Sequence, residues 1–209
     1  MNYVENIYIC LAAPMIVAAI LLSSEKRRLL LFLVVGMTTC LLSSYVNTFL
    51  ATSYGADRLS ASLELAPTVE EIMKLFPVLF YLLVFNPKKE QAVESSLIIA
   101  IGFATFENVN YLMMNDASNV LHLLIRGFGT GTMHVVTGVV IAIGLNFLWD
   151  RPFIKVVGTL VLLCTASIYH AIYNILVSQT GAAAVIGYFI PVVTAIMAVI
   201  LKNKLKRLL

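Results

Sequence analysis

The chain consists of one long apolar stretch after another, and this pattern restricts its fold more than any other feature. A helix that crosses the hydrocarbon core of a membrane needs about 20 mostly apolar residues. Stretches of this kind follow one another with short polar connections, at residues 6–22, 29–50, 66–85, 95–114, 120–148, 156–177 and 182–201. We therefore predict an all-α polytopic protein of about seven transmembrane helices, a multi-pass protein of the cell membrane.

Composition supports the same conclusion. Hydrophobic residues make up 60% of the 209 residues, charged residues only 12%, and the mean hydropathy is +0.94. Soluble domains carry about 25% charged residues, so a soluble protein is excluded. Because no long loop or low-complexity tract interrupts the stretches, we expect residues 1–209 to form a single transmembrane domain.

The positive charges lie in alternate connections between the stretches. Eleven of the 14 Lys and Arg residues fall at 26–28, 88–89, 151–155 and 202–207, all on one side of a seven-span count. Short cytoplasmic loops are enriched in Lys and Arg, so we predict an outside N-terminus and a cytoplasmic C-terminus. The net charge of +3 is then a signal of topology. We expect the lipid bilayer and a membrane protein as partners, and no nucleic acid.

Ionisable residues also occur inside the predicted spans, where each costs about 2.5 to 3.5 kcal/mol on insertion scales. At 1.5 Å per residue from the span ends, most of them lie roughly 6 to 20 Å below the outer surface. Four helices would thus direct polar groups into the outer half of the bilayer, which predicts one shared site. Its residues are Glu70, Glu71, Lys74, Glu107, Arg126, His134 and His170. For Arg126 alone, snorkelling to the outer interface is an equally good interpretation.

Three short motifs lie on the third, fourth and sixth predicted spans. They are E-E-x-x-K at 70–74, F-x-x-x-E at 103–107 and H-x-x-x-N at 170–174. In this order they resemble the PrsW-type intramembrane proteases, which are similar to the type II CAAX prenyl endopeptidases and the anterior-pharynx-defective subunit of gamma-secretase. The resemblance covers residues 66–177, and Asp is also expected in the family where this chain has Asn174. It implies cleavage of a single-span membrane protein, such as an anti-sigma factor, near its extracytoplasmic end.

Peptide hydrolysis needs an activated water, which a carboxylate pair in a low dielectric can supply. We predict Glu70 and Glu71 as the base and its partner, with Lys74 as a supporting residue that orients the pair. Glu107 would position the same water. Glu70 and Glu71 point about 100° apart on a helix, so the sequence does not show which one faces the water.

Hydrolysis also needs hydrogen-bond donors for the oxyanion of the tetrahedral intermediate. We predict His170 and Asn174 for this role, His134 as a second donor, and Arg126 as a supporting residue.

Three alternatives remain open at this point. We predict no cofactor, but Glu71, Glu107, His134 and His170 are also a plausible ligand set for zinc, which would make the protein a zinc-dependent protease. A non-catalytic membrane scaffold is the second alternative. An ion-coupled transporter is the third, because buried sets of Glu, Lys and His also relay protons.

Overall fold

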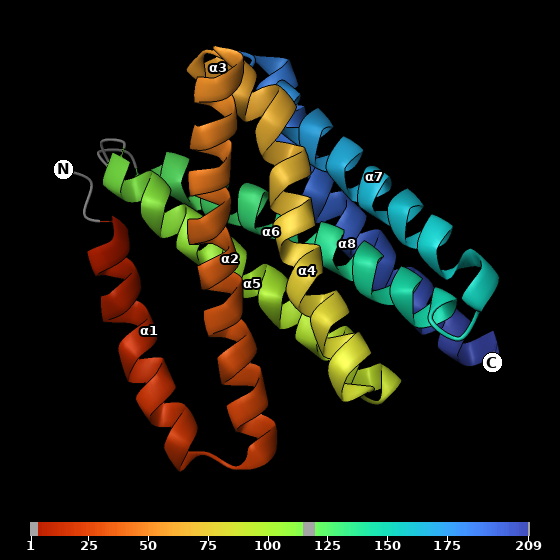
Figure 1. The fold of residues 1–209 in the computed structure, drawn as a ribbon. Helices are drawn as coiled ribbons and strands as arrows, with labels where there is room; N and C mark the ends of the chain where they lie inside the picture. Colours follow the sequence, from red (N-terminus) through yellow and green to blue (C-terminus); the bar gives the residue numbers. More distant parts are fainter. Residues whose placement is uncertain (1–3, 115–119, 209) are drawn as a thin grey trace.

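The computed structural model describes residues 4–114 and 120–208, with side chains up to residue 200, and these residues form helices and no strand. The order of elements is α1 (Val4–Leu21), α2 (Ser24–Tyr54), α3 (Arg58–Ser60), η1 (Ala61–Leu65), α4 (Ala66–Phe85), α5 (Lys89–Met114), α6 (Val120–Leu148), α7 (Pro152–Val177) and α8 (Ala182–Leu208). Seven of these helices are long, and they pack side by side as a bundle (Figure 1).

Six of the long helices are long and apolar enough to cross a membrane: α1, α2, α5, α6, α7 and α8. The predicted all-α membrane fold is thereby confirmed. The seventh long helix, α4, has the length of a span, but it carries Glu70, Glu71 and Lys74. Its charges need shielding from lipid, and α4 packs against α2, α5 and α7.

The bounds of α4 and α6 agree with the predicted spans, while α2 and α5 begin several residues earlier than predicted. Both helices start with charged residues, such as Lys26 and Glu90, which extend a helix into the interface but lower its hydropathy. The short α3 and the π-helix η1 were not predicted. A π-helix is rare and often occurs near functional sites, and η1 leads directly into α4.

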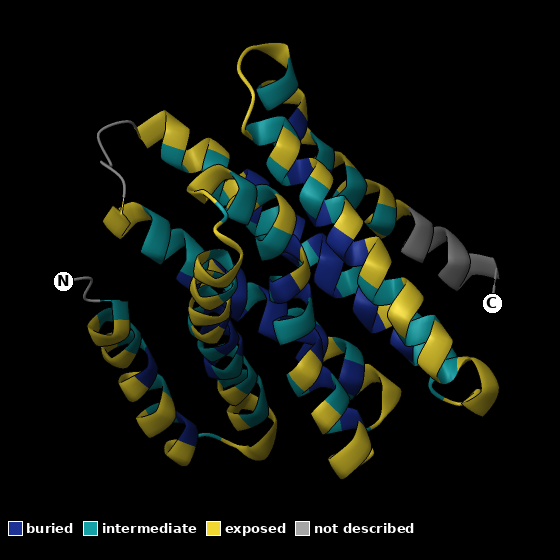
Figure 2. Cartoon of the chain, turned by 45° about the horizontal axis from the view of Figure 1, so that its top comes forward, coloured by how far each residue is buried: buried dark blue, intermediate teal, exposed yellow. Residues whose placement is uncertain are grey.

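Buried residues lie on the inward faces of the helices, and exposed apolar residues cover the outside of the bundle (Figure 2). The closest helix crossing joins α2 to α5. A Cβ atom at Gly36 would lie 2.2 Å from the carbonyl oxygen of Ile99, and one at Gly102 would lie 2.2 Å from that of Leu33. The two backbones therefore touch, as small residues allow in membrane helices. This contact fixes α5 at Phe103, one turn before Glu107.

The basic connections lie at one end of the bundle. Arg28 near the start of α2 pairs with Glu94 of α5 at 3.0 Å, and Lys89 at the start of α5 pairs with Asp150 after α6 at 2.5 Å. We call this the basic end. The side chains of Lys202, Lys204, Lys206 and Arg207, which also entered the topology prediction, lie outside the described residues.

Which membrane face the basic end occupies stays a prediction. We expect a reporter inserted between Pro87 and Lys88 to be cytoplasmic, because short basic loops are retained on that side. A reporter inserted after Gln179, in the turn at the other end of the bundle, should be extracytoplasmic. Protease protection in spheroplasts measures both, and an extracytoplasmic reporter at Pro87 would overturn the orientation.

Candidate active site

Helix α4 contributes a buried ion pair to the centre of the bundle. Lys74 Nζ donates to Glu71 Oε1 at 2.7 Å, and the side chains of Glu71 and Lys74 are only 1% and 7% exposed. The ammonium group also contacts His134 Nδ1 at 3.1 Å and donates to Thr137 Oγ1 at 3.1 Å, both from α6. Buried charges are tolerated where they are paired and hydrogen-bonded in this way.

His134 lies at the meeting point of α4, α5 and α6 and is fully buried. A Lys ammonium group only donates, so His134 Nδ1 accepts from Lys74 and the ring proton is on Nε2. Nε2 makes a short hydrogen bond to Glu107 Oε2 of α5. The other oxygen of Glu107 accepts from Arg126 at 3.3 Å.

Arg126 is held in turn by α5, because its guanidinium group stacks 3.5 Å from the centre of the Tyr111 ring. The predicted supporting residue thus pairs with Glu107 and does not merely reach the interface. The side chains of Glu107 and Arg126 are 26% and 17% exposed, so they form the most open side of the cluster.

Helix α7 brings His170 against both glutamates of α4. Its Nδ1 lies 3.0 Å from Glu71 Oε1, and its Nε2 lies 3.8 Å from Glu70 Oε2. A carboxylate only accepts, so His170 Nδ1 donates to Glu71, and Nε2 on the other side of the ring faces Glu70. The rings of His134 and His170 meet edge to face, with centroids 5.1 Å apart.

Glu70 differs from Glu71 in its lack of partners. Its Oε2 atom is buried and has no hydrogen-bond partner among the described residues. Its side chain is 14% exposed, compared with 1% for Glu71. A buried carboxylate oxygen without a donor is costly, so Glu70 is poised to receive a cation or a water. The open question between the two glutamates thereby has a geometric answer: Glu70 is available, and Glu71 is occupied.

Seven of the eight predicted site residues belong to this connected cluster: Glu70, Glu71, Lys74, Glu107, Arg126, His134 and His170. Asn174 does not join these contacts. Its Nδ2 donates to the carbonyl oxygen of Ser62 in η1 at 3.0 Å. The Asn174 amide therefore connects α7 to η1, and this contact gives no support to the predicted role of Asn174 as an oxyanion donor.

Thr137 was missed by the sequence reasoning although it contacts Lys74. It lies three residues after His134 on the same helix face, so the spacing contains the signal. A threonine inside an apolar helix attracts little notice, however, because its hydroxyl group usually bonds to its own backbone.

The donor set of the cluster fits a metal ion. Glu70, His134 and His170 each offer one ligand atom, and these atoms lie within 4.8 Å of one another. Two imidazoles and one carboxylate are the protein ligands of many catalytic zinc sites. Glu70 Oε2 and His170 Nε2 are ready to bind, while His134 would exchange its contact with Lys74 or Glu107 for the metal.

A bundle of apolar helices that encloses a cluster of carboxylates and imidazoles defines the class of this protein as a membrane protein with a buried polar site. The comparison with protein families narrows the class. Residues 25–201 match the family model described as PrsW family intramembrane metalloprotease, so the chain belongs to this family. No curated protein and no solved structure matches the chain.

Family membership confirms the resemblance seen in the motifs. The protein is a multi-pass membrane protein and an intramembrane protease, hence a hydrolase, with a membrane protein as substrate. The word metalloprotease in the family's description also favours a metal ion over the prediction of no cofactor. The group that could hold a metal differs in part from the set expected in the zinc alternative. It contains Glu70 with His134 and His170, whereas Glu71 and Glu107 each bond to one of the two histidines.

Proposed function

We propose that this protease hydrolyses a peptide bond of a single-span membrane protein at the cluster of Glu70, His134 and His170. The observation that carries the proposal is the unpartnered Oε2 atom of Glu70, directed at His170 in the middle of a bundle where every other carboxylate of the cluster is bonded. Strongly buried polar groups of this kind mark functional sites in membrane proteins.

Glu70, His134 and His170 would hold a zinc ion, which when bound polarises a carbonyl group and lowers the pKa of a bound water. Glu71 fixes the ring of His170 by accepting from its Nδ1 atom, so that Nε2 is directed at Glu70. Carboxylates that orient ligand imidazoles in this way raise ligand basicity. Lys74 compensates the charge of Glu71, which is otherwise buried without a counter-ion.

Glu107 is the most exposed carboxylate of the cluster and is the base in this proposal. It accepts a proton from the attacking water as the water oxygen bonds to the carbonyl carbon. It then returns the proton to the amide nitrogen as the C–N bond breaks. Arg126 holds Glu107 at the open side of the cluster. In a mechanism without metal, Glu70 itself would take the proton from water.

The substrate is proposed to be a single-span protein such as an anti-sigma factor, cut near its extracytoplasmic end. Glu70 is the fifth residue of α4, which starts at the end of the bundle away from the basic connections. A scissile bond that reaches Glu70 would thus lie in the outer half of the bilayer if the basic end is cytoplasmic.

Incubating the purified, reconstituted protein with a single-span substrate tests this function. We expect mass spectrometry to find one cut within the substrate's transmembrane segment or just outside it, on the side opposite the basic end. The same sequence supplied as a soluble domain without its span should stay intact. A cut on the basic side, or equal cleavage of the soluble form, would contradict the proposal.

A further inference from the structure

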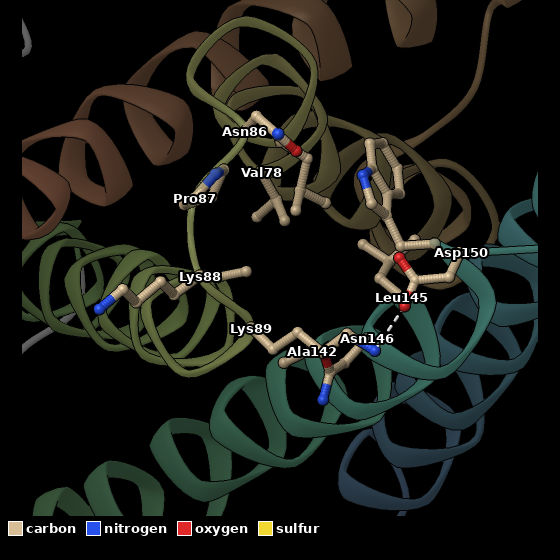
Figure 3. Close-up of a pocket in the computed structure, with 12 residues that line it drawn as sticks. Val78, Asn86, Pro87, Lys88, Lys89, Ala142, Leu145, Asn146 and Asp150 are labelled. Atoms are coloured by element: carbon tan, nitrogen blue, oxygen red, sulfur yellow. Dashed lines mark ion pairs between the residues drawn. The ribbon is translucent and has the colours of Figure 1, made fainter.

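A cavity lies at the basic end of the bundle, away from the active site. It has a volume of about 180 Å³ and lies between α4, α5 and α6. Figure 3 shows that side chains from the ends of these helices and from their connecting loops surround it. None of its lining residues belongs to the catalytic cluster.

The walls of the cavity are apolar on the inside and polar at the mouth. Its inner part is formed by Val78, Leu82, Ala92, Ala142 and Leu145. The mouth carries Asn86, Lys88, Lys89, Asn146 and Asp150, with Trp149 beside them. A cavity with this division, at the depth of a membrane interface, suits a molecule with an apolar chain and a polar head.

Two observations define the head. Asn146 lines the cavity, and its Oδ1 atom is buried with no hydrogen-bond partner among the described residues. A turn of this amide toward the cavity would let Oδ1 accept from the occupant, which should therefore offer a hydroxyl or amine donor. Lys88, Lys89 and Asp150 line the cavity, and Lys155 contacts the lining Trp149, which gives three cations against one acidic residue. The occupant should therefore also carry a negative charge.

Lys89 reaches across the mouth to Asp150, as Figure 3 shows, and both side chains are more than half exposed. An exposed pair of this kind is weak, so the ammonium group can turn to a phosphate at small cost. Lys155 lies 3.6 Å from the centre of the Trp149 ring, which brings a further cation to the same rim.

We propose that this cavity binds an anionic phospholipid with a hydroxyl-bearing headgroup, such as phosphatidylglycerol, from the leaflet at the basic end. One acyl chain enters between Val78 and Ala142, the phosphate meets Lys89, and a headgroup hydroxyl donates to Asn146. The site is independent of the proposed cleavage mechanism, because no catalytic residue lines it.

Native mass spectrometry of the whole protein released from nanodiscs tests the proposal, with phosphatidylglycerol and phosphatidylcholine as probes. We expect the wild type to retain one phosphatidylglycerol in preference to phosphatidylcholine, by about tenfold or more. Ala142→Phe should fill the cavity and abolish the retained lipid. Its control, Ile143→Phe, changes the neighbouring exposed residue and should retain the lipid as the wild type does.

Asn146→Asp keeps the shape of the side chain but places a negative charge where the head binds, so it should lose the preference as well. Gln179→Glu adds the same charge in an exposed turn at the other end and should keep it. If Ala142→Phe fails to fold, the lipid preference of Asn146→Asp is the measurement that decides the proposal. Equal retention of both lipids by the wild type, or an unchanged preference in Asn146→Asp, would overturn the proposal. Displacement of the lipid by inorganic phosphate at millimolar concentration would show an anion site without a chain, and would overturn it too.

Discussion

Replacing Glu70 with Gln is expected to lower the cleavage rate by a factor of about 10² to 10⁴. The change removes a ligand of the proposed metal site or, in the mechanism without metal, the general base, whose loss has an effect of this size. The amide keeps the shape of the side chain but loses the negative charge that a metal ion or an attacking water requires. Because Glu70 Oε2 accepts no hydrogen bond from any described residue, the change should leave folding nearly intact. Cleavage of a membrane-anchored substrate by purified protein measures the rate, and thermal unfolding measures the stability.

Glu64→Gln is the matched control for this experiment. Glu64 is an exposed residue of η1, six positions before Glu70. Its replacement makes the same chemical change outside the cluster. It should cleave at the wild-type rate. Wild-type cleavage by Glu70→Gln, with Glu71→Gln inactive instead, would reverse the roles assigned to the two glutamates.

Replacing Lys74 with Met is expected to have the largest effect on stability. It leaves Glu71 buried at the centre of the bundle without its counter-ion, and breaking a buried pair in this way costs about 3 to 5 kcal/mol. The double variant Lys74→Met with Glu71→Gln removes both charges and should recover part of the loss, because the two changes share one interaction. Thermal unfolding in detergent micelles measures all three proteins.

Lys89→Met provides the comparison, since Lys89 forms an exposed pair with Asp150. Its loss should cost at most about 1 kcal/mol. If Lys74→Met were as stable as Lys89→Met, Glu71 would not be a buried carboxylate that depends on Lys74.

The long helices could be predicted from the sequence because a lipid environment requires about 20 apolar residues in each span, and this requirement leaves a continuous signal. The first residues of α2 and α5 were harder to predict. Each helix begins several residues before its apolar stretch, because charged side chains extend the helix into the interface. The short α3 and η1 have no such periodic signal. The π-helix η1 contacts α2 and α7, and contacts with other helices leave no local pattern in the sequence.

The site residues could be found from depth and spacing, but their pairing could not. Lys74 is three residues from Glu71 and four from Glu70, and both spacings allow contact on a helix. The structure pairs Lys74 with Glu71, where His134 and His170 complete the hydrogen bonds from elsewhere in the chain. Spacing along the helix was also insufficient to predict the partner of Asn174. This residue lies one turn after His170 on the same helix face, but it donates its hydrogen bond to Ser62.

Removal and restoration of zinc tests the central claim most directly, namely that Glu70, His134 and His170 form one metal site at which a membrane protein is cut. The purified protein is treated with a chelator, its zinc content is measured by elemental analysis, and cleavage of a single-span substrate is followed before and after zinc is added back. We expect one zinc per chain in the wild type, loss of cleavage with loss of the metal, and recovery of both. Undiminished cleavage by protein that contains no zinc would contradict the metal site, and would leave Glu70 as the direct activator of water.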